Sequence, residues 1–118
     1  MQFIQKKILI KKFLLIVLVF VVYLLIKINL FPVSDCDNLD IPVFNESSIS
    51  VFNGQDLNKP VYIAYQGCVY DVTSGRDKFY GLDMEYNYLT GRDSTKELNI
   101  AGGGIIKSKY KLVGKYEK

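Results

Sequence analysis

KPVYIAYQGCVYDVTSGRDKFYG, residues 59–81, is the stretch of sequence that decides the fold. It contains two runs rich in β-branched and aromatic residues, 60–64 and 68–72, separated by Tyr65-Gln66-Gly67. Two such runs on either side of a short turn that contains glycine predict an antiparallel hairpin. After Gly75 the β-branched residues almost vanish, so we expect the chain to leave the sheet there.

On both sides of the hairpin the sequence predicts short helices and one further strand. The helix that precedes the hairpin is expected to end at Asn53-Gly54, and the glycine run 102–104 is interpreted as a flexible connection. A small sheet with short helices at one side is an α+β fold. The predicted helices span about residues 46–52, 76–80, 83–89 and 93–99, and the closing strand spans 108–115. On a helix from Asp83, Tyr86 and Thr90 would share a face and Tyr88 would point elsewhere.

An apolar segment precedes this domain. Residues 13–26 carry no charge, and extension to Val33 gives a helix of about 31 Å, which matches the ~30 Å hydrocarbon core of a bilayer. The alternative is a cleaved signal peptide, but the residues around Ser34 form a poor cleavage site. We therefore predict a transmembrane signal anchor. The predicted organisation is a basic tail (1–12), the anchor (13–33), an acidic linker (34–43) and a folded domain (44–118).

The charges predict how such an anchor would be oriented. Residues 1–33 carry five lysines and no acid, so the net charge of +3 belongs to this tail, and it gives no support to nucleic-acid binding. We expect a single-pass protein of the endoplasmic reticulum or endomembrane system. The positive-inside rule predicts that its domain is lumenal. A cytosolic domain is the alternative. Asn45-Glu46-Ser47 is a glycosylation sequon, and Asn45 is also expected to cap a helix, with Phe44 as a hydrophobic staple.

The absence of histidine excludes several kinds of site. The chain has no histidine and two cysteines, so it cannot form a Ser-His-Asp triad, a histidine zinc site or a haem site with two imidazoles. Two cysteines are also too few for a zinc cage or an iron–sulfur cluster within one chain. Cys36 and Cys68 would pair only if the domain is lumenal and the linker folds back, and we expect free thiols.

Several short motifs recur in a fixed order along the domain. They are Asn53-Gly54 with Asp56, residues 59–64, residues 67–73, Gly75-Arg76, Phe79-Tyr80-Gly81 and Gly91-Arg92-Asp93-Ser94. The ordered set closely resembles the membrane-associated progesterone receptor family, whose members have cytochrome b5-like haem/steroid-binding domains. The resemblance runs from about Phe44 to Gly114.

This resemblance implies a cytochrome b5-like fold that binds haem without histidine. The family's haem-ligating tyrosine corresponds to Tyr86, and its supporting residues correspond to Tyr80, Lys109 and Tyr110. The resemblance implies non-covalent binding of ferric haem b through Tyr86. It also implies a role as a partner or regulator of membrane enzymes, such as haem-thiolate monooxygenases of sterol metabolism, with a haem-linked homodimer and no turnover of its own.

Two departures from the family pattern affect the pocket. The loop between the two tyrosines is Leu82-Asp83-Met84-Glu85 rather than rich in glycine and proline, and we expect Met84 to pack rather than to approach the iron. The segment before Lys109 is shorter than in animal members, so helices that wall the pocket are expected to be missing. The alternatives are an interaction module that binds no haem, or a carrier of a sterol or another small lipid.

Overall fold

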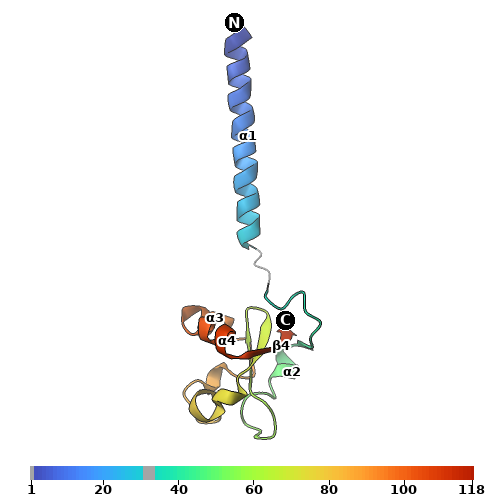
Figure 1. Ribbon diagram of the computed structural model, residues 1–118, viewed down its shortest axis with the longest axis vertical. Helices are drawn as coiled ribbons and strands as arrows, with labels where there is room; N and C mark the ends of the chain where they lie inside the picture. Colours follow the sequence, from blue (N-terminus) through green and yellow to red (C-terminus); the bar gives the residue numbers. More distant parts are fainter. Residues whose placement is uncertain (1, 31–33) are drawn as a thin grey trace. The chain divides into compact units, whose positions relative to one another are not determined.

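The computed structural model describes residues 2–30 and 34–118, and the chain divides into two units between Val33 and Ser34. The first unit is a single helix, α1 (Gln2–Leu30), in which the basic tail and the apolar run are continuous (Figure 1). Its segment Ile4–Lys27 contains an 18-residue window with a mean hydropathy of 2.8 and is long and apolar enough to cross a membrane. The last three residues of the predicted anchor, 31–33, lie outside the described residues.

The second unit is built on a four-stranded sheet with the order β1-β4-β3-β2. Its strands are β1 (Val43–Phe44), β2 (Tyr62–Tyr65), β3 (Cys68–Asp71) and β4 (Lys111–Tyr116). The predicted hairpin is confirmed, since β2 and β3 pair antiparallel with Tyr62 opposite Asp71. Gln66 and Gly67 make the turn with φ angles of 51° and 78°. β4 pairs antiparallel with β3 and parallel with β1, and β1 lies at the start of the predicted domain.

Short helices connect these strands. They are α2 (Glu46–Ile49), η1 (Thr73–Gly75), η2 (Arg76–Tyr80), η3 (Asn87–Leu89), α3 (Thr95–Ile100) and α4 (Gly103–Lys109). The predicted cap is confirmed: Asn45 Oδ1 accepts the Ser48 N–H at 2.8 Å, and Ser48 Oγ accepts the Asn45 N–H at 2.8 Å. This reciprocal capping box satisfies two backbone donors at the start of α2. The helix is shorter than predicted and ends at Ile49.

Two predicted elements were wrong. Residues 83–86 form turns rather than a helix, and Asp83 has a φ of 68°, which interrupts helical geometry. The glycine run is not a flexible connection. Gly102, with a φ of 98°, caps α4, and Gly103 is the first residue of this helix. Residue 103 must be glycine because the Tyr65 ring occupies the space that a Cβ atom would need.

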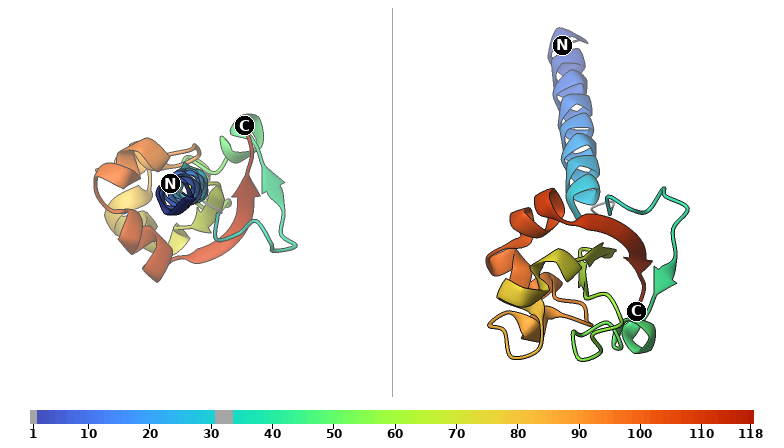
Figure 2. Two further views of the ribbon diagram at one scale, coloured as in Figure 1. Left: turned by 90° about the horizontal axis from the view of Figure 1, so that it is seen from above. Right: turned by 60° about the horizontal axis from the view of Figure 1, so that its bottom comes forward.

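Two buried clusters cover the two faces of the sheet. Ile63, Tyr65 and Tyr70 belong to the larger cluster, which also contains side chains from η2, η3, α3 and α4. Ala64 and Val69 point to the other face and pack with Ile49 of α2. Period-2 alternation along β2 and β3 produces this division. Figure 2 shows α2 on one side of the sheet, separate from α3 and α4.

The linker is part of the folded unit, and the expectation of free thiols was wrong. Cys36 and Cys68 form a disulfide with a Cα–Cα distance of 5.8 Å. The linker folds back because its backbone continues the sheet: the Lys115 N–H donates to the Pro42 carbonyl at 2.8 Å. The Lys115 ammonium also donates to the Asp37 carbonyl at 3.1 Å. Both cysteines are buried in the larger cluster.

Candidate ligand-binding site

A pocket of about 710 Å³ opens beside the larger cluster. Its walls come from η2, from the segment that ends in η3, and from α3 and α4. This volume lies within the range of about 300–1,000 Å³ that small-molecule sites occupy. Aromatic and aliphatic side chains dominate the lining, which consists of Phe79, Tyr80, Tyr86, Tyr88, Leu89, Glu97, Leu98, Ile100, Ala101, Gly102, Ile105, Lys109 and Tyr110.

All four residues that the sequence pointed to, Tyr80, Tyr86, Lys109 and Tyr110, line this pocket. Tyr80 and Tyr110 are buried, at 8% and 7% exposure, and their rings meet edge to face with centroids 5.7 Å apart. Tyr86 is 39% exposed, and its ring centroid lies 6.4 Å from that of Tyr80. The pocket therefore has a buried tyrosine pair and a third tyrosine that is accessible to a ligand.

Backbone hydrogen bonds hold Tyr80 and Tyr86 on the same pocket. The Tyr86 N–H donates to the Phe79 carbonyl at 2.9 Å, which closes the loop between the two tyrosines. The Asn87 side-chain amide donates to the Tyr80 and Asn53 carbonyls, each at 2.9 Å. Because these bonds fix the backbone on both sides of the loop, Tyr86 faces the pocket even though no regular helix carries it.

Gly75 permits the close approach of the tyrosine pair. A Cβ atom at this position would lie 2.8 Å from the Tyr110 hydroxyl and 2.8 Å from Cδ2 of Tyr80. Both distances are shorter than ordinary van der Waals contact. The pair can pack against the turn before η2 only because residue 75 has no side chain.

Burial decides the protonation state of Tyr80. Burial raises the pKa of Tyr80 to about 12. Three smaller effects contribute to this rise in the pKa: the charge of Tyr110, the hydrogen bond with the Tyr110 side chain, and the charge of Tyr86. A buried phenol is harder to ionise because the low-dielectric surroundings disfavour its charged form. Tyr80 is therefore a neutral phenol at physiological pH, which suits a hydrogen-bond donor rather than an anionic ligand.

Two charged side chains of opposite sign reach the pocket. Lys109, the last residue of α4, has its Nζ 5.8 Å from the Phe79 ring centroid and 5.6 Å from the Tyr110 centroid. Glu97 of α3 pairs through Oε1 with Arg92 at 3.1 Å. Its other carboxylate oxygen, Oε2, is buried and has no hydrogen-bond partner within residues 2–30 and 34–118.

Several site predictions made from the sequence were wrong. Tyr88 lines the pocket beside Tyr86, whereas Thr90 is buried and donates its hydroxyl to the Asn87 carbonyl. The pocket keeps its walls, because α3 and α4 supply much of the lining in spite of the short segment before Lys109. Met84 does not belong to the lining, and it is 37% exposed and belongs to neither buried cluster, so the packing role predicted for it is not observed.

Sequence reasoning missed the contribution of α3. Glu97 and Ile100 line the pocket, and their i, i+3 spacing places them on one face of α3, while Ala101, the residue that caps the end of this helix, adds to the lining. That spacing is visible in the sequence, but it carried no signal until the start of the helix at Thr95 was known.

The donor set of the pocket fits a haem. Flat aromatic and aliphatic walls suit a porphyrin, and the accessible phenol of Tyr86 offers an oxygen ligand of the kind that can hold haem iron. Within the described part of the chain, no group of three or more His, Cys, Asp or Glu side chains could hold a free metal ion. Tyr86 would hold the iron, and Tyr80, Tyr110 and Lys109 would surround it.

Comparisons with known proteins agree with this fold and pocket. Residues 45–117 match the Cytochrome b5-like Heme/Steroid binding domain. "Probable steroid-binding protein 3" of Arabidopsis thaliana is 40% identical over 55 residues, which cover 47% of this chain and 54% of that protein. "Membrane-associated progesterone-binding protein 4" of Arabidopsis thaliana is 32% identical over 69 residues, covering 56% of this chain and 28% of that protein. The chain thus spans about half or less of these relatives.

A solved structure shows the same fold. An Arabidopsis thaliana protein described as having a cytochrome b5 like fold superposes with a TM-score of 0.59 at 24% identity, covering 73% of this chain and all of that one. The profile match covers most of the second unit, including every residue of the pocket lining. The chain is a member of the cytochrome b5-like haem/steroid-binding domain family, with relatives of the membrane-associated progesterone-binding type.

Proposed function

We propose that this protein binds ferric haem b non-covalently and that Tyr86 would hold the iron. The observation that carries the proposal is the meeting of the three motif tyrosines, Tyr80, Tyr86 and Tyr110, and of Lys109 on a single apolar pocket, which Tyr88 also lines, in a family member without histidine. Tyr86 is the exposed member of the three, and the buried Tyr80 and Tyr110 support it.

Two polar groups of the pocket could assist a tyrosine oxygen that holds iron. A phenol ionises near pH 10 in water, so it binds a metal at neutral pH only where positive charge or hydrogen bonds favour the anion. Lys109 supplies a positive charge at the pocket, and the neutral Tyr80 supplies a hydrogen-bond donor. When bound, the haem supplies a ferric iron that an anionic oxygen ligand stabilises against reduction.

We further propose that the protein acts through other proteins and not by turnover of its own. The apolar side chains at the pocket give a surface on which a haem-linked homodimer or a membrane enzyme can assemble. Haem-thiolate monooxygenases of sterol metabolism are the partner class that we propose, because relatives carry steroid-binding and progesterone-binding names.

Three observations support a single-pass anchor with a lumenal domain in the endoplasmic reticulum or another endomembrane. α1 is long and apolar enough to cross a membrane, and lysines precede its apolar run. The Cys36–Cys68 disulfide supports the lumenal side, because disulfides persist in oxidising compartments and are rare in the cytosol. We propose that α1 is a signal anchor.

Titration of the full chain with hemin in detergent tests the haem proposal. We expect a Soret shift and a high-spin ferric phenolate spectrum, and we expect Tyr86→Phe to lose it. Tyr88→Phe is the matched control, because it removes a hydroxyl from the same pocket two residues away and should keep the spectrum. A chain that gives no Soret shift would contradict haem binding and favour an interaction module.

A second candidate function is the binding of a sterol or another small lipid. The buried, unpartnered Oε2 of Glu97 favours it, since a carboxylate oxygen at an apolar wall can accept a hydrogen bond from a sterol hydroxyl. In this case a labelled sterol should bind saturably. Binding should be weakened by Glu97→Gln and unaffected by Tyr86→Phe, which reverses the pattern expected for haem.

A further inference from the structure

We propose that Asn45 carries an N-linked glycan, an inference that rests on the proposed lumenal orientation. Asn45-Glu46-Ser47 matches the N-x-S/T acceptor sequence, and all three residues are exposed. A sequon alone is weak evidence, because the same asparagine has a structural role as the cap of α2. The hydrogen bonds of the cap decide whether both roles are compatible.

The cap leaves the glycosylated atom free. Asn45 uses Oδ1 to accept the Ser48 N–H and its own backbone N–H to donate to Ser48 Oγ. A glycan is attached to Nδ2, and among the described residues no hydrogen bond involves that atom or the Ser47 hydroxyl. Because the linkage removes one of the two Nδ2 hydrogens and leaves Oδ1 in place, the glycosylated side chain can still cap α2.

The reaction is a group transfer without redox change. The co-reactant is an oligosaccharide linked to a lipid through pyrophosphate, supplied by the transferase of the secretory pathway. The Asn45 Nδ2–C1 bond forms, the C1–oxygen bond to pyrophosphate breaks, the lipid pyrophosphate leaves, and Nδ2 loses one proton.

The disulfide gives independent support for the compartment. Cys36 lies nine positions before Asn45 on the same segment, and its bond to Cys68 needs an oxidising environment. The disulfide and the glycan would therefore be formed in the same lumen. The disulfide is an observation that does not use the charges of α1.

The glycan would leave the pocket open. α2 packs through Ile49 on the face of the sheet that carries Ala64 and Val69, whereas α3 and α4, which line the pocket, lie on the other face. Figure 2 shows the ribbon of α2 apart from those of α3 and α4. A glycan at Asn45 therefore covers the α2 face. It leaves the aromatic mouth of the pocket as the face available to ligands and partners.

The test uses the full chain expressed in eukaryotic cells, with glycosidase treatment and gel mobility as the readout. We expect one glycosidase-sensitive shift for the unmodified chain and none for Ser47→Ala, which destroys the sequon without touching the cap. Ser48→Ala is the matched control: it removes the side-chain partner from the capping box, keeps the sequon and should keep the shift.

A second acceptor sequon appended after Lys118 separates this inference from the orientation on which it rests. If the appended site is modified and Asn45 is not, the domain is lumenal and the inference is wrong. If neither site is modified, both the lumenal orientation and the glycan are wrong. Modification of both sites, with loss of one in Ser47→Ala, supports both.

Discussion

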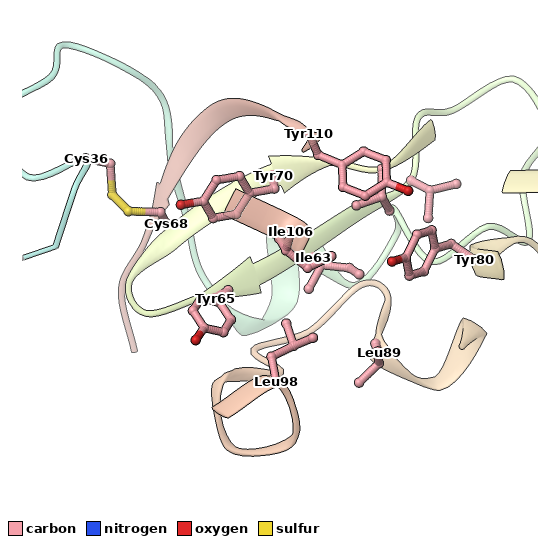
Figure 3. Close-up of a cluster of buried hydrophobic side chains, with 12 residues drawn as sticks. Cys36, Ile63, Tyr65, Cys68, Tyr70, Tyr80, Leu89, Leu98, Ile106 and Tyr110 are labelled. Atoms are coloured by element: carbon pink, nitrogen blue, oxygen red, sulfur yellow. A yellow bond between two sulfur atoms is a disulfide. The ribbon is translucent and has the colours of Figure 1, made fainter. Parts of the chain in front are cut away.

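The rings of Tyr80 and Tyr110 meet edge to face, with their planes at 82° and their centroids 5.7 Å apart. Such T-shaped pairs contribute about 0.5–1.5 kcal/mol beyond the area they bury. The pair lies at one end of the larger buried cluster, and the Cys36–Cys68 disulfide lies at the other (Figure 3). The pocket therefore depends on this tyrosine pair more directly than on the disulfide.

Gly75→Ala should destabilise the domain and weaken hemin binding. A Cβ atom there would lie 2.8 Å from both tyrosine side chains, and overpacking of this kind costs about 1–3 kcal/mol. Gly104→Ala is the control, because no atom lies within 4 Å of its Cβ position and the helix should gain about 0.5–1 kcal/mol. Urea unfolding of the full chain in detergent measures both. Equal stability and hemin affinity in Gly75→Ala would show that the tyrosine pair can move.

The protein should lose stability at alkaline pH. Burial raises the pKa of Tyr80 from 10.0 to about 12, so the folded chain holds this proton more tightly than the unfolded chain. The resulting stabilisation, about 2–3 kcal/mol, is complete below pH 10 and disappears as the pH rises through about 12. Burial also raises the pKa values of Tyr62, Tyr70 and Tyr116, which adds in the same direction.

Near-ultraviolet circular dichroism across this pH range gives the measurement. Tyr80→Phe should flatten the pH dependence, whereas Tyr88→Phe, which replaces an exposed side chain, should leave it unchanged. A Tyr80→Phe variant with the original alkaline profile would assign the effect to the other buried tyrosines.

Local sequence patterns predicted the parts of the fold that local physics determines. The β2–β3 hairpin follows from two β-rich runs and a glycine turn, and the α2 cap follows from Asn45 and its polar neighbours. The four pocket residues were found through an ordered motif set, not through periodicity. Their positions on one pocket became visible only when η2 and α4 were placed beside the same sheet face.

The features that the sequence did not predict depend on contacts between distant segments. The Cys36–Cys68 bond joins residues 32 positions apart, and it requires an acidic linker to continue the sheet beside β4. The glycine run looks flexible by composition, yet the position of Tyr65 makes glycine necessary at Gly103. Met84 and Glu85 are good helix formers, but the positive φ of Asp83 and the closure from Tyr86 to Phe79 override that preference.

Removal of the disulfide should cost stability and spare the ligand site. The bond closes a loop between residues 32 positions apart, for which chain entropy predicts about 3–4 kcal/mol. The double variant Cys36→Ala, Cys68→Ala should therefore unfold at lower urea, and hemin should still give its spectrum below the transition. A reducing agent should lower the stability of the unmodified chain by a similar amount and leave the variant unchanged. Loss of the hemin spectrum in the folded variant would show that the disulfide-bonded linker affects the pocket.

Lys109→Gln should weaken hemin binding by about 1 kcal/mol, which is a loss of affinity of about fivefold. The reason is that its ammonium lies at the pocket beside the Phe79 and Tyr110 rings, where a positive charge attracts an anionic ligand oxygen. Lys111→Gln is the matched control, since it removes the same charge from an exposed position outside the lining. Added salt should reduce the hemin affinity of the unmodified chain more than that of Lys109→Gln. The reason is that salt screens the exposed ammonium of Lys109, which the variant lacks. Equal losses in the two variants would mean that hemin responds to net charge and not to the position of Lys109.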